Sequence, residues 1–472
     1  MPVIILVADG ARPDTFEAAL DSGALPALTR LRAEGALHSV SSVFPSVTGP
    51  AYAPFIMGRF PGPVGLPGLR WYDRARQATR FPDYTRSYVG VDMRHVDRDL
   101  DPHAPTLFEL APTSLAALNV IGRGLRPRDR LGRGATFALR AARTHFSGDV
   151  RGWLRIDRDI GLEAARRIHD DQPDVAFVAL TGVDKTSHSE GHEADVVRDA
   201  LAIVDETAAE IRGRLERDGR WEQTHLWVVS DHGHSRVGTH DDLDRLVRGW
   251  GHGTISHPWV YGFGRDVAVM VSGNAMAHLY LELARQDRPW WPALAPRWGS
   301  LADELLARPS VDLMLLPHSP TRCEVRGRGR GTALVEMEPA RGGGATFTYR
   351  PQDGDPLSLG GELAGLDAGA AHDACAPTDY PDGLVQIAHL AGAPRSGEIV
   401  LSASRDWDFR ARYEPIPHVS AHGALHREHM LVPLLVNRPP SRTPRRTTDV
   451  MPSALAALGL EIPGGLDGES FL

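Results

Sequence analysis

The strongest constraint on the fold comes from three apolar runs, each of which leads into an acidic residue. VIILVADG reaches Asp9, DVAFVALTGVDKTSH passes through Asp184, and HLWVVSDHGH reaches Asp231 and His232. Runs that are apolar at every position predict strands buried on both faces, as in parallel sheets. Ligands of such sheets bind beyond the carboxyl ends of the strands. We therefore expect the three aspartates to converge at one edge of a sheet.

Helical patterns separate these runs and follow the last of them. They cover residues 22–35, 160–171, 194–219 and 448–459. Strands that alternate with helices predict an α/β fold, with a mostly parallel central sheet and helices on both faces.

The amino-acid composition of the sequence changes at about residue 262. Residues 262–385 are rich in Gly, Pro and Trp and contain short strand-like pieces such as TRCEVRG and ATFTYRP. We predict that they form an inserted α+β lobe that caps the site, because an apolar strand pattern returns with MLVPLLV near the C-terminus. Residues 1–261 and 386–472 would then form the catalytic core.

Composition restricts the class of protein and the kind of metal site. The chain has 472 residues and a net charge of −8, which argues against general nucleic-acid binding. No apolar run is long enough for a membrane span, and the N-terminus does not resemble a signal peptide, so we expect a cytoplasmic protein. With only Cys323 and Cys375 available, any metal must be bound by His and carboxylates.

One segment is locally basic. Residues 123–143 read RGLRPRDRLGRGATFALRAAR and contain a single acid. They could bind an anionic substrate or partner, although a solvated helical face is the favoured interpretation.

Thr48, in SVTGPAYAP, stands directly before Gly-Pro and a predicted helix over residues 51–57. Thr is a common helix cap and Pro suits the first helical position, so capping is one interpretation. The alternative is that its hydroxyl is a nucleophile facing a phosphate. The second interpretation requires a base or a metal to remove the hydroxyl proton.

Possible metal ligands follow in a definite order along the chain. Asp184 and His188 form D-x-x-x-H, which brings two ligands to one side of a helical turn. Asp231 and His232 are adjacent at a strand end, and His422 precedes another apolar strand. The H-G-A-L-H context favours His422 over its neighbours His426 and His429. His192 and His234 stand close to the predicted ligands in the sequence and could orient them.

These residues resemble motifs of the alkaline phosphatase superfamily, and most closely its type I phosphodiesterase/nucleotide pyrophosphatase family. The resemblance lies in ADG, SVTGPAYAP, VDKTSHSEGH, SDHGH, SAHG and the closing TTDVMPSALAALGL and GGLDGESF. It covers most of the chain outside residues 75–160 and the predicted lobe.

The resemblance implies a site with two divalent metal ions, Zn²⁺ by preference and Mn²⁺ as the alternative. It assigns one metal to Asp184, His188 and His422. It assigns the second metal to Asp9, Asp231, His232 and the Thr48 oxygen. Thr48 would attack phosphorus and form a covalent phospho-threonine, which water then hydrolyses.

The chain departs from the family pattern just after the nucleophile helix. The family commonly has an Asn there that donates a hydrogen bond to the phosphoryl group, whereas GLPGLRWYDR has Leu69 at that position. Arg70 could contact the phosphoryl group instead, or it could be a surface residue. Lys185, the only lysine in the chain, could reach substrate phosphate from beside Asp184 or point to solvent.

The implied activity is metal-dependent hydrolysis of phosphate esters, as a phosphodiesterase or nucleotide pyrophosphatase, on a small phosphorylated substrate such as a nucleotide. A phosphomonoesterase or phosphonate hydrolase is the main alternative. A sulfatase is disfavoured because that branch requires Cys or Ser at the position of Thr48. A catalytically silent relative that binds a phosphorylated ligand is the alternative outside enzymes.

Overall fold

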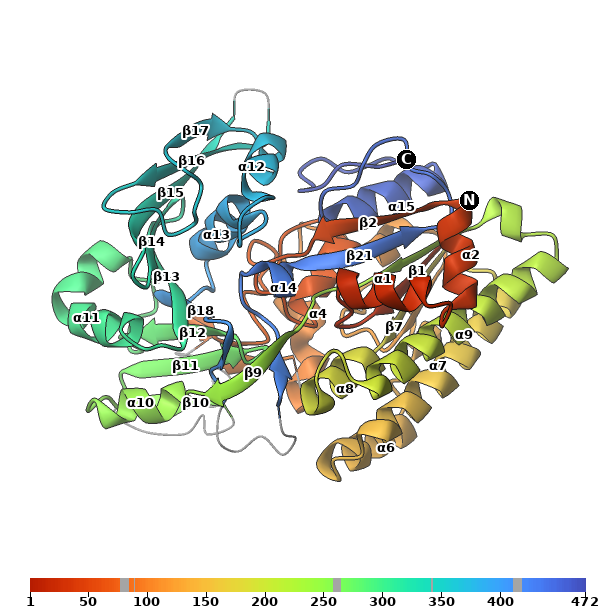
Figure 1. Cartoon of the computed structure of the whole chain (residues 1–472), viewed down its shortest axis with the longest axis horizontal. Coiled ribbons are helices and arrows are strands. Elements are labelled where there is room, and N and C mark those ends of the chain that lie inside the picture. The colour runs from red at the N-terminus through yellow and green to blue at the C-terminus, as the bar shows by residue number, and fades with distance from the viewer. Residues whose placement is uncertain (77–84, 89, 258–264, 341–342, 411–417) are drawn as a thin grey trace.

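The computed structural model describes residues 1–76, 85–88, 90–257, 265–340, 343–410 and 418–472 (Figure 1). The described chain contains a central sheet of seven strands and, beside it, a second sheet of nine strands. The order in the central sheet is β2 (Ala36–Ser41), β21 (Leu431–Val436), β8 (His225–Val229), β1 (Val3–Ala8), β7 (Val175–Leu180), β5 (Ser114–Ala117) and β6 (Arg130–Leu131).

The central sheet is mostly parallel, which confirms the predicted fold class. Strand β1 pairs in parallel with β7 and β8, and β5 pairs in parallel with β7 and β6. Strand β21 is antiparallel to both β8 and β2. The three apolar runs of the sequence are therefore the three adjacent strands β8, β1 and β7, and their carboxyl ends meet.

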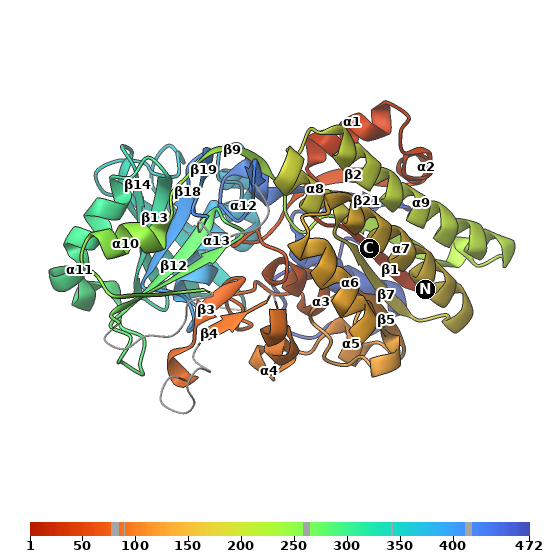
Figure 2. The same ribbon diagram turned by 90° about the horizontal axis from the view of Figure 1, so that it is seen from below.

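Both faces of the central sheet are buried. Alternate residues of β1 belong to two apolar clusters: Val3, Ile5 and Val7 face one side, and Ile4, Leu6 and Ala8 face the other. The second face is covered by α1 (Pro13–Asp21), α2 (Pro26–Glu34), α7 (Val150–Asp171) and α9 (Asp195–Arg217) (Figure 2). The first is covered by α3 (Ala53–Met57), α4 (Val96–Asp99), α5 (Leu107–Leu110) and α15 (Val450–Leu458).

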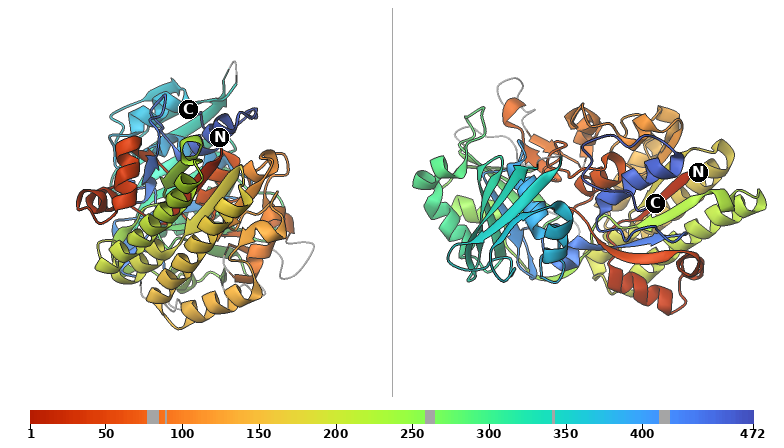
Figure 3. Two further views of the ribbon diagram at one scale, coloured as in Figure 1. Left: turned by 90° about the vertical axis from the view of Figure 1, so that its right-hand side faces the viewer. Right: turned by 90° about the horizontal axis from the view of Figure 1, so that it is seen from above.

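The second sheet lies beside the core (Figure 3). Its order is β10 (Thr254–Ser256), β11 (Val267–Ser272), β12 (Met276–Leu281), β18 (Ile399–Ala403), β13 (Val311–Ser319), β14 (Arg322–Gly327), β15 (Gly331–Pro339), β16 (Ala345–Pro351) and β17 (Leu363–Leu366). Helices α10 (Leu243–Gly249) and α11 (Trp291–Leu306) pack on one face, and α12 (Ala368–Cys375) and α13 (Gly383–Gly392) pack on the other.

The sheet extends beyond the predicted lobe at both ends. Strand β10 comes before residues 262–385 in the sequence and β18 comes after them. The second sheet therefore includes residues on both sides of the predicted lobe.

Further elements lie outside these two sheets and the helices named above. They are a 3-10 turn at Pro50–Tyr52, β3 (Arg70–Tyr72), β4 (Thr85–Ser87), α6 (Ala135–Phe146), α8 (Gly182–Glu190), β9 (Ser235–His240), β19 (Asp406–Asp408), β20 (Ser420–Ala421) and α14 (Arg427–Met430). None of the helices in the described ranges combines the length and the apolar content that crossing a membrane requires. Cys323 and Cys375 are both buried as free thiols.

A buried polar network joins the second sheet to the core. The Arg446 guanidinium donates from Nε and Nη2 to the two oxygens of Asp382, at 2.7 and 2.6 Å. Asp382 also accepts from Gln386 of α13 at 2.7 Å, and Gln386 in turn bonds the backbone of Ser42 and Phe44. This network therefore reaches the segment that leads to Thr48.

Replacing Arg446 by Met should lower the free energy of unfolding by about 3–5 kcal/mol, because it leaves the Asp382 carboxylate buried without its charge partner. The shift in the urea midpoint measures this loss. Arg445→Ala is the matched control, since the neighbouring arginine forms an exposed pair with Asp373. The control should lose no more than about 1 kcal/mol. Equal losses in the two variants would contradict a structural role for the buried pair.

Candidate active site

Two aspartates lie at the carboxyl ends of β1 and β8. Asp9 directly follows β1, whereas Ser230 stands between the end of β8 and Asp231. Both aspartates are buried. The Gly10 backbone N–H donates to Asp231 Oδ1 at 3.2 Å, which holds the two strand ends together. Gly10 is required here: its φ is +84°, and a Cβ would lie 3.0 Å from the Asp184 backbone and the His234 ring.

Thr48 faces these residues and does not cap a helix. Gly49 occupies the cap position of the 3-10 turn that begins at Pro50, with no side-chain capping bond. The Thr48 hydroxyl lies 3.0 Å from Asp9 Oδ1 and 2.9 Å from His232 Nε2. Capping, one of the two interpretations of this Thr, is therefore wrong.

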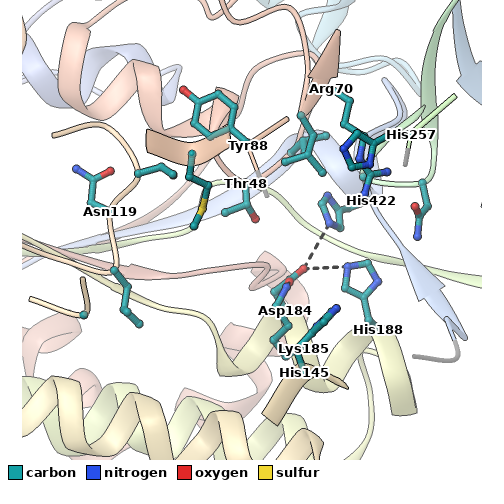
Figure 4. Close-up of a pocket in the computed structure, with 18 of the residues that line it drawn as sticks. Thr48, Arg70, Tyr88, Asn119, His145, Asp184, Lys185, His188, His257 and His422 are labelled. Atoms are coloured by element: carbon teal, nitrogen blue, oxygen red, sulfur yellow. Dashed lines mark hydrogen bonds and ion pairs between the residues drawn. The ribbon is translucent and has the colours of Figure 1, made fainter. Parts of the chain in front are cut away.

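Asp184 lies in the first turn of α8, just beyond β7, and is the centre of the histidine cluster. Its Oδ1 lies 3.0 Å from the Nε2 of His234, 3.2 Å from that of His188 and 3.4 Å from that of His422. Its Oδ2 accepts from Lys185 Nζ at 2.7 Å. Figure 4 shows His188 and His422 turned toward this carboxylate.

Three histidines present the same ring nitrogen to the carboxylates. Their Nδ1 atoms lie near backbone carbonyls: His188 at 2.9 Å from Ser420, His422 at 2.9 Å from Ser46, and His232 at 3.1 Å from Gly233. A carbonyl can only accept, so each Nδ1 carries a hydrogen, and the neutral form of each ring has its lone pair on Nε2. This is the tautomer that binds a metal through Nε2.

The carboxylates perturb one another. Burial, with Asp231 and Asp184 nearby, raises the pKa of Asp9 well above its usual value, and burial also raises the pKa of Asp231. Burial opposes ionisation of Asp184 too, but Lys185 and His188 bring its pKa well below the usual range. Burial lowers the pKa of His422 well below its ordinary value. The cluster therefore combines a neutral His422 imidazole with crowded acids.

The residues fit divalent metal ions. Asp231 Oδ2 is buried without a hydrogen-bond donor in the described ranges, an arrangement that is costly unless a cation satisfies it. Two sets of side chains have ligand atoms all within 4.8 Å of one another. They are Asp9, Asp231 and His232, and Asp184, His232, His234 and His422. His/carboxylate donors of this kind suit Zn²⁺.

His234 reaches the cluster directly, although its sequence position suggested only an orienting role. It is fully buried, with Nδ1 at 3.1 Å from the Ser420 hydroxyl. The other histidines near the motifs bond elsewhere: His192 lies 3.9 Å from Glu193, His426 2.8 Å from Glu428, and His429 2.8 Å from the Ser235 hydroxyl. Among the late histidines, His422 is the one that meets Asp184.

A cavity of about 550 Å³ opens beside Thr48. Arg70 and His257 line it on one side of Thr48, Tyr88 and Asn119 line it on another, and Lys185 lies below (Figure 4). Leu69 also lines it while packing against the core, and its backbone N–H donates to the Ser272 hydroxyl at 3.0 Å.

Sequence reasoning missed several of the residues that line this cavity. They are His145, His257, Asn274 and His418. His418 stands four residues before His422, and its ring centre lies 4.4 Å from that of His188, so proximity to the SAHG motif was the one available signal.

Asp157 of α7 supports the turn that carries Asp184. Its Oδ2 accepts the Gly182 backbone N–H at 2.5 Å, and burial raises its pKa to about 7 despite this bond. Because the folded state holds a proton that the unfolded chain has released, stability falls as pH rises from about 4 to about 7.

Asp157→Asn should remove this pH dependence and keep an acceptor for Gly182. Between pH 5 and pH 8, native protein should lose on the order of 2–3 kcal/mol relative to Asp157→Asn, as measured by urea unfolding in a chelator. Asp159→Asn, which changes an exposed carboxylate of the same helix, is the control. A difference between native and Asp157→Asn protein that is constant across pH would contradict this role.

The chain was compared with known proteins. A family model for type I phosphodiesterase/nucleotide pyrophosphatase matches residues 3–288, and no curated protein matches the sequence. Similar solved structures include phosphonoacetate hydrolase from Sinorhizobium meliloti 1021 in complex with phosphonoformate, at 17% identity, 97% and 95% coverage of this chain and that chain, and a TM-score of 0.58.

Murine ectonucleotide pyrophosphatase/phosphodiesterase 5 is similar at 15% identity, 98% and 96% coverage, and a TM-score of 0.57. An inactive Thr-to-Ala variant of the murine protein, in complex with AMP, matches equally well. At these identities the solved structures establish an alkaline phosphatase-like fold. The residues that the family model matches make up more than half of the sequence, and they include Asp9, Thr48, Asp184, Asp231 and His232. The chain therefore belongs to the type I phosphodiesterase/nucleotide pyrophosphatase family.

Proposed function

We propose that this protein hydrolyses phosphodiesters through a covalent intermediate on Thr48. The observation that carries the proposal is the position of the Thr48 hydroxyl, between Asp9 and His232 and facing the cavity. The family match supports phosphoester hydrolysis. The murine relative was solved with AMP as an inactive Thr-to-Ala variant, which supports a nucleotide as one candidate substrate.

We further propose that two divalent metal ions bind here. Asp184, His188 and His422 would hold one, with His234 beside them, and Asp9, Thr48, Asp231 and His232 would hold the other. When bound, the ions would lower the pKa of the Thr48 hydroxyl and neutralise charge on the phosphoryl oxygens. Zn²⁺ is the preferred ion and Mn²⁺ the alternative.

The proposed reaction has two steps. Thr48 Oγ gives up its proton and bonds to phosphorus while the bond from phosphorus to the leaving oxygen breaks, and the leaving group takes up that proton. Water then attacks phosphorus, and Thr48 Oγ departs and regains its hydrogen, so two in-line displacements retain the configuration at phosphorus. Asp9 Oδ1, 3.0 Å from Thr48 Oγ, orients the hydroxyl for the first step.

Arg70 and Lys185 are proposed to contact the phosphoryl group. Both line the cavity, and Lys185 Nζ lies 2.7 Å from Asp184. Leu69 occupies the position of the family's Asn, and the guanidinium of the neighbouring Arg70 would favour a more highly charged group than an amide does. This one substitution supports the second candidate, a phosphomonoesterase or phosphonate hydrolase, in line with the phosphonate ligand of the bacterial relative.

Two expectations from the sequence are kept as proposals. Residues 262–385 would be an inserted lobe that helps to select the leaving group, because its sheet lies beside the cavity. A cytoplasmic location is supported by the two buried free thiols.

Thr48→Ala should lower the rate of bis-p-nitrophenyl phosphate hydrolysis by at least about 10³-fold, because no other hydroxyl replaces the nucleophile. Thr48→Ser should keep measurable activity. Metal content, measured on both variants by mass spectrometry, separates a lost nucleophile from a lost ligand. A Thr48→Ala protein that retains metal and full activity would refute the mechanism, and native protein that turns over no ester despite bound metal would favour a silent ligand-binding relative.

Arg70→Gln should lower kcat/KM for p-nitrophenyl phosphate by about 100-fold and for the diester by about 10-fold, because a dianion gains more from a guanidinium. Arg128→Gln, which changes an exposed arginine, is the control. If Arg70 replaces the missing amide, Leu69→Asn in the Arg70→Gln background should restore part of the diester activity. Equal, small effects on both substrates would rule out contact between Arg70 and the phosphoryl group.

A further inference from the structure

Helix α6 presents an apolar face to solvent. It lies at the outer surface of the molecule, packed against α7 (Figure 2). Of its twelve residues, Thr144 alone is buried. Leu139 and Phe146 are 74% and 77% exposed, more than any other large apolar side chain of the described chain.

The exposed apolar residues form a regular stripe. Ala135, Leu139, Ala142 and Phe146 follow the spacing i, i+4, i+7 and i+11, which places them on one side of a helix. This is the pattern of a helix face that packs against another apolar surface, yet here all four residues are exposed. The stripe, defined by these four residues, therefore lacks a partner among the residues that the structure describes.

Positive charge surrounds the stripe. Residues 120–148 contain seven arginines and one aspartate, a net charge of +6 in a chain whose total is −8. Arg140 pairs with Asp159, whereas Arg133 and Arg143 form no ion pair with a described residue. Arg133 is held by backbone carbonyls instead, at 2.6 Å from Asn119 and 2.7 Å from Val120. Arg143, beside the stripe, is thus available to an anionic partner, and Arg140 is held only by a pair that is exposed on both sides.

We propose that α6 docks on the surface of an anionic lipid bilayer, with the stripe in the interfacial layer and the arginines on lipid phosphates. Short amphipathic helices that combine apolar residues with arginine bind such surfaces, and anionic lipids add about 1 kcal/mol per basic residue near the surface.

A second copy of the chain is a poorer occupant. Four side chains, two of them alanine, fall far short of the 20–30 residues that each side of a stable protein interface buries. Self-pairing of α6 would also bring Arg140 and Arg143 against their counterparts, with no acid on the helix to compensate them. A bilayer requires no matching shape and supplies the opposite charge.

The position of α6 gives this surface a consequence. Phe137, His145 and Phe146 of the same helix also line the cavity beside Thr48. A docked α6 would therefore hold the mouth of the cavity at the headgroup layer, where phosphate esters are concentrated. Docking itself does not depend on the reaction proposed above.

Cosedimentation with vesicles tests the proposal. The full-length protein should pellet with vesicles of phosphatidylcholine and phosphatidylglycerol, and about 0.5 M NaCl should weaken this binding because salt screens the arginines. Vesicles of phosphatidylcholine alone should retain much less protein. Leu139→Glu should weaken binding to the anionic vesicles by at least about tenfold, since it places a charge in the stripe.

Leu162→Glu is the matched control, because Leu162 is an apolar residue of α7 that is 48% exposed and outside the stripe. It should bind as native protein does. Leu139→Glu should also hydrolyse bis-p-nitrophenyl phosphate at the native rate, which separates docking from catalysis. Native protein that binds neither vesicle, or Leu139→Glu that binds as well as native protein, would overturn the proposal. A native dimer that Leu139→Glu converts to a monomer would overturn it in favour of a second copy.

Discussion

Three buried carboxylates at the carboxyl ends of adjacent strands are the constraint on which the rest of the site depends. Asp9, Asp184 and Asp231 follow β1, β7 and β8, and the parallel register of these strands brings them together. Mutual repulsion and burial oppose their ionisation, so the cluster is stable only with compensating groups. The chain supplies a lysine, several imidazoles and an N–H from Gly10, and Asp231 Oδ2, which accepts no hydrogen bond from the described residues, indicates where a cation would fit.

The core of the site could be predicted because its residues stand at the ends of long apolar strands. A run such as VIILVA is buried on both faces only in the middle of a sheet, so the position of Asp9 follows from its neighbours. The role of the Thr48 hydroxyl was harder to predict, since a Thr before Gly-Pro is compatible with a helix cap. The contacts with Asp9 and His232 decided this question, and those contacts join residues that are 39 and 184 positions apart in the chain.

Most of the residues that could not be predicted come from loops or from the second sheet, and His145 comes from α6. His257, Asn274 and His418 reach the cavity because β10, β11 and β20 pass beside it, and no local pattern encodes that path. The limits of the second sheet were also hidden, because β10 and β18 are short strands outside the Gly- and Pro-rich segment. His234 differs from these: it stands two residues after a recognised ligand, but its direction depends on the hydrogen bond with Ser420.

The polar link through Gln386 gives the molecule a mechanical property. Gln386 accepts from the Phe44 N–H and donates to the Ser42 carbonyl, while Ser46, two residues before Thr48, donates to the Ala424 carbonyl and accepts from His422. The segment that leads to Thr48 is thus tethered on both sides, to the helix packed on the second sheet and to the loop that carries His422. A displacement of one sheet relative to the other would act as a lever on Thr48, so the alignment of the two halves of the molecule helps to set where the Thr48 hydroxyl stands relative to Asp9 and His232.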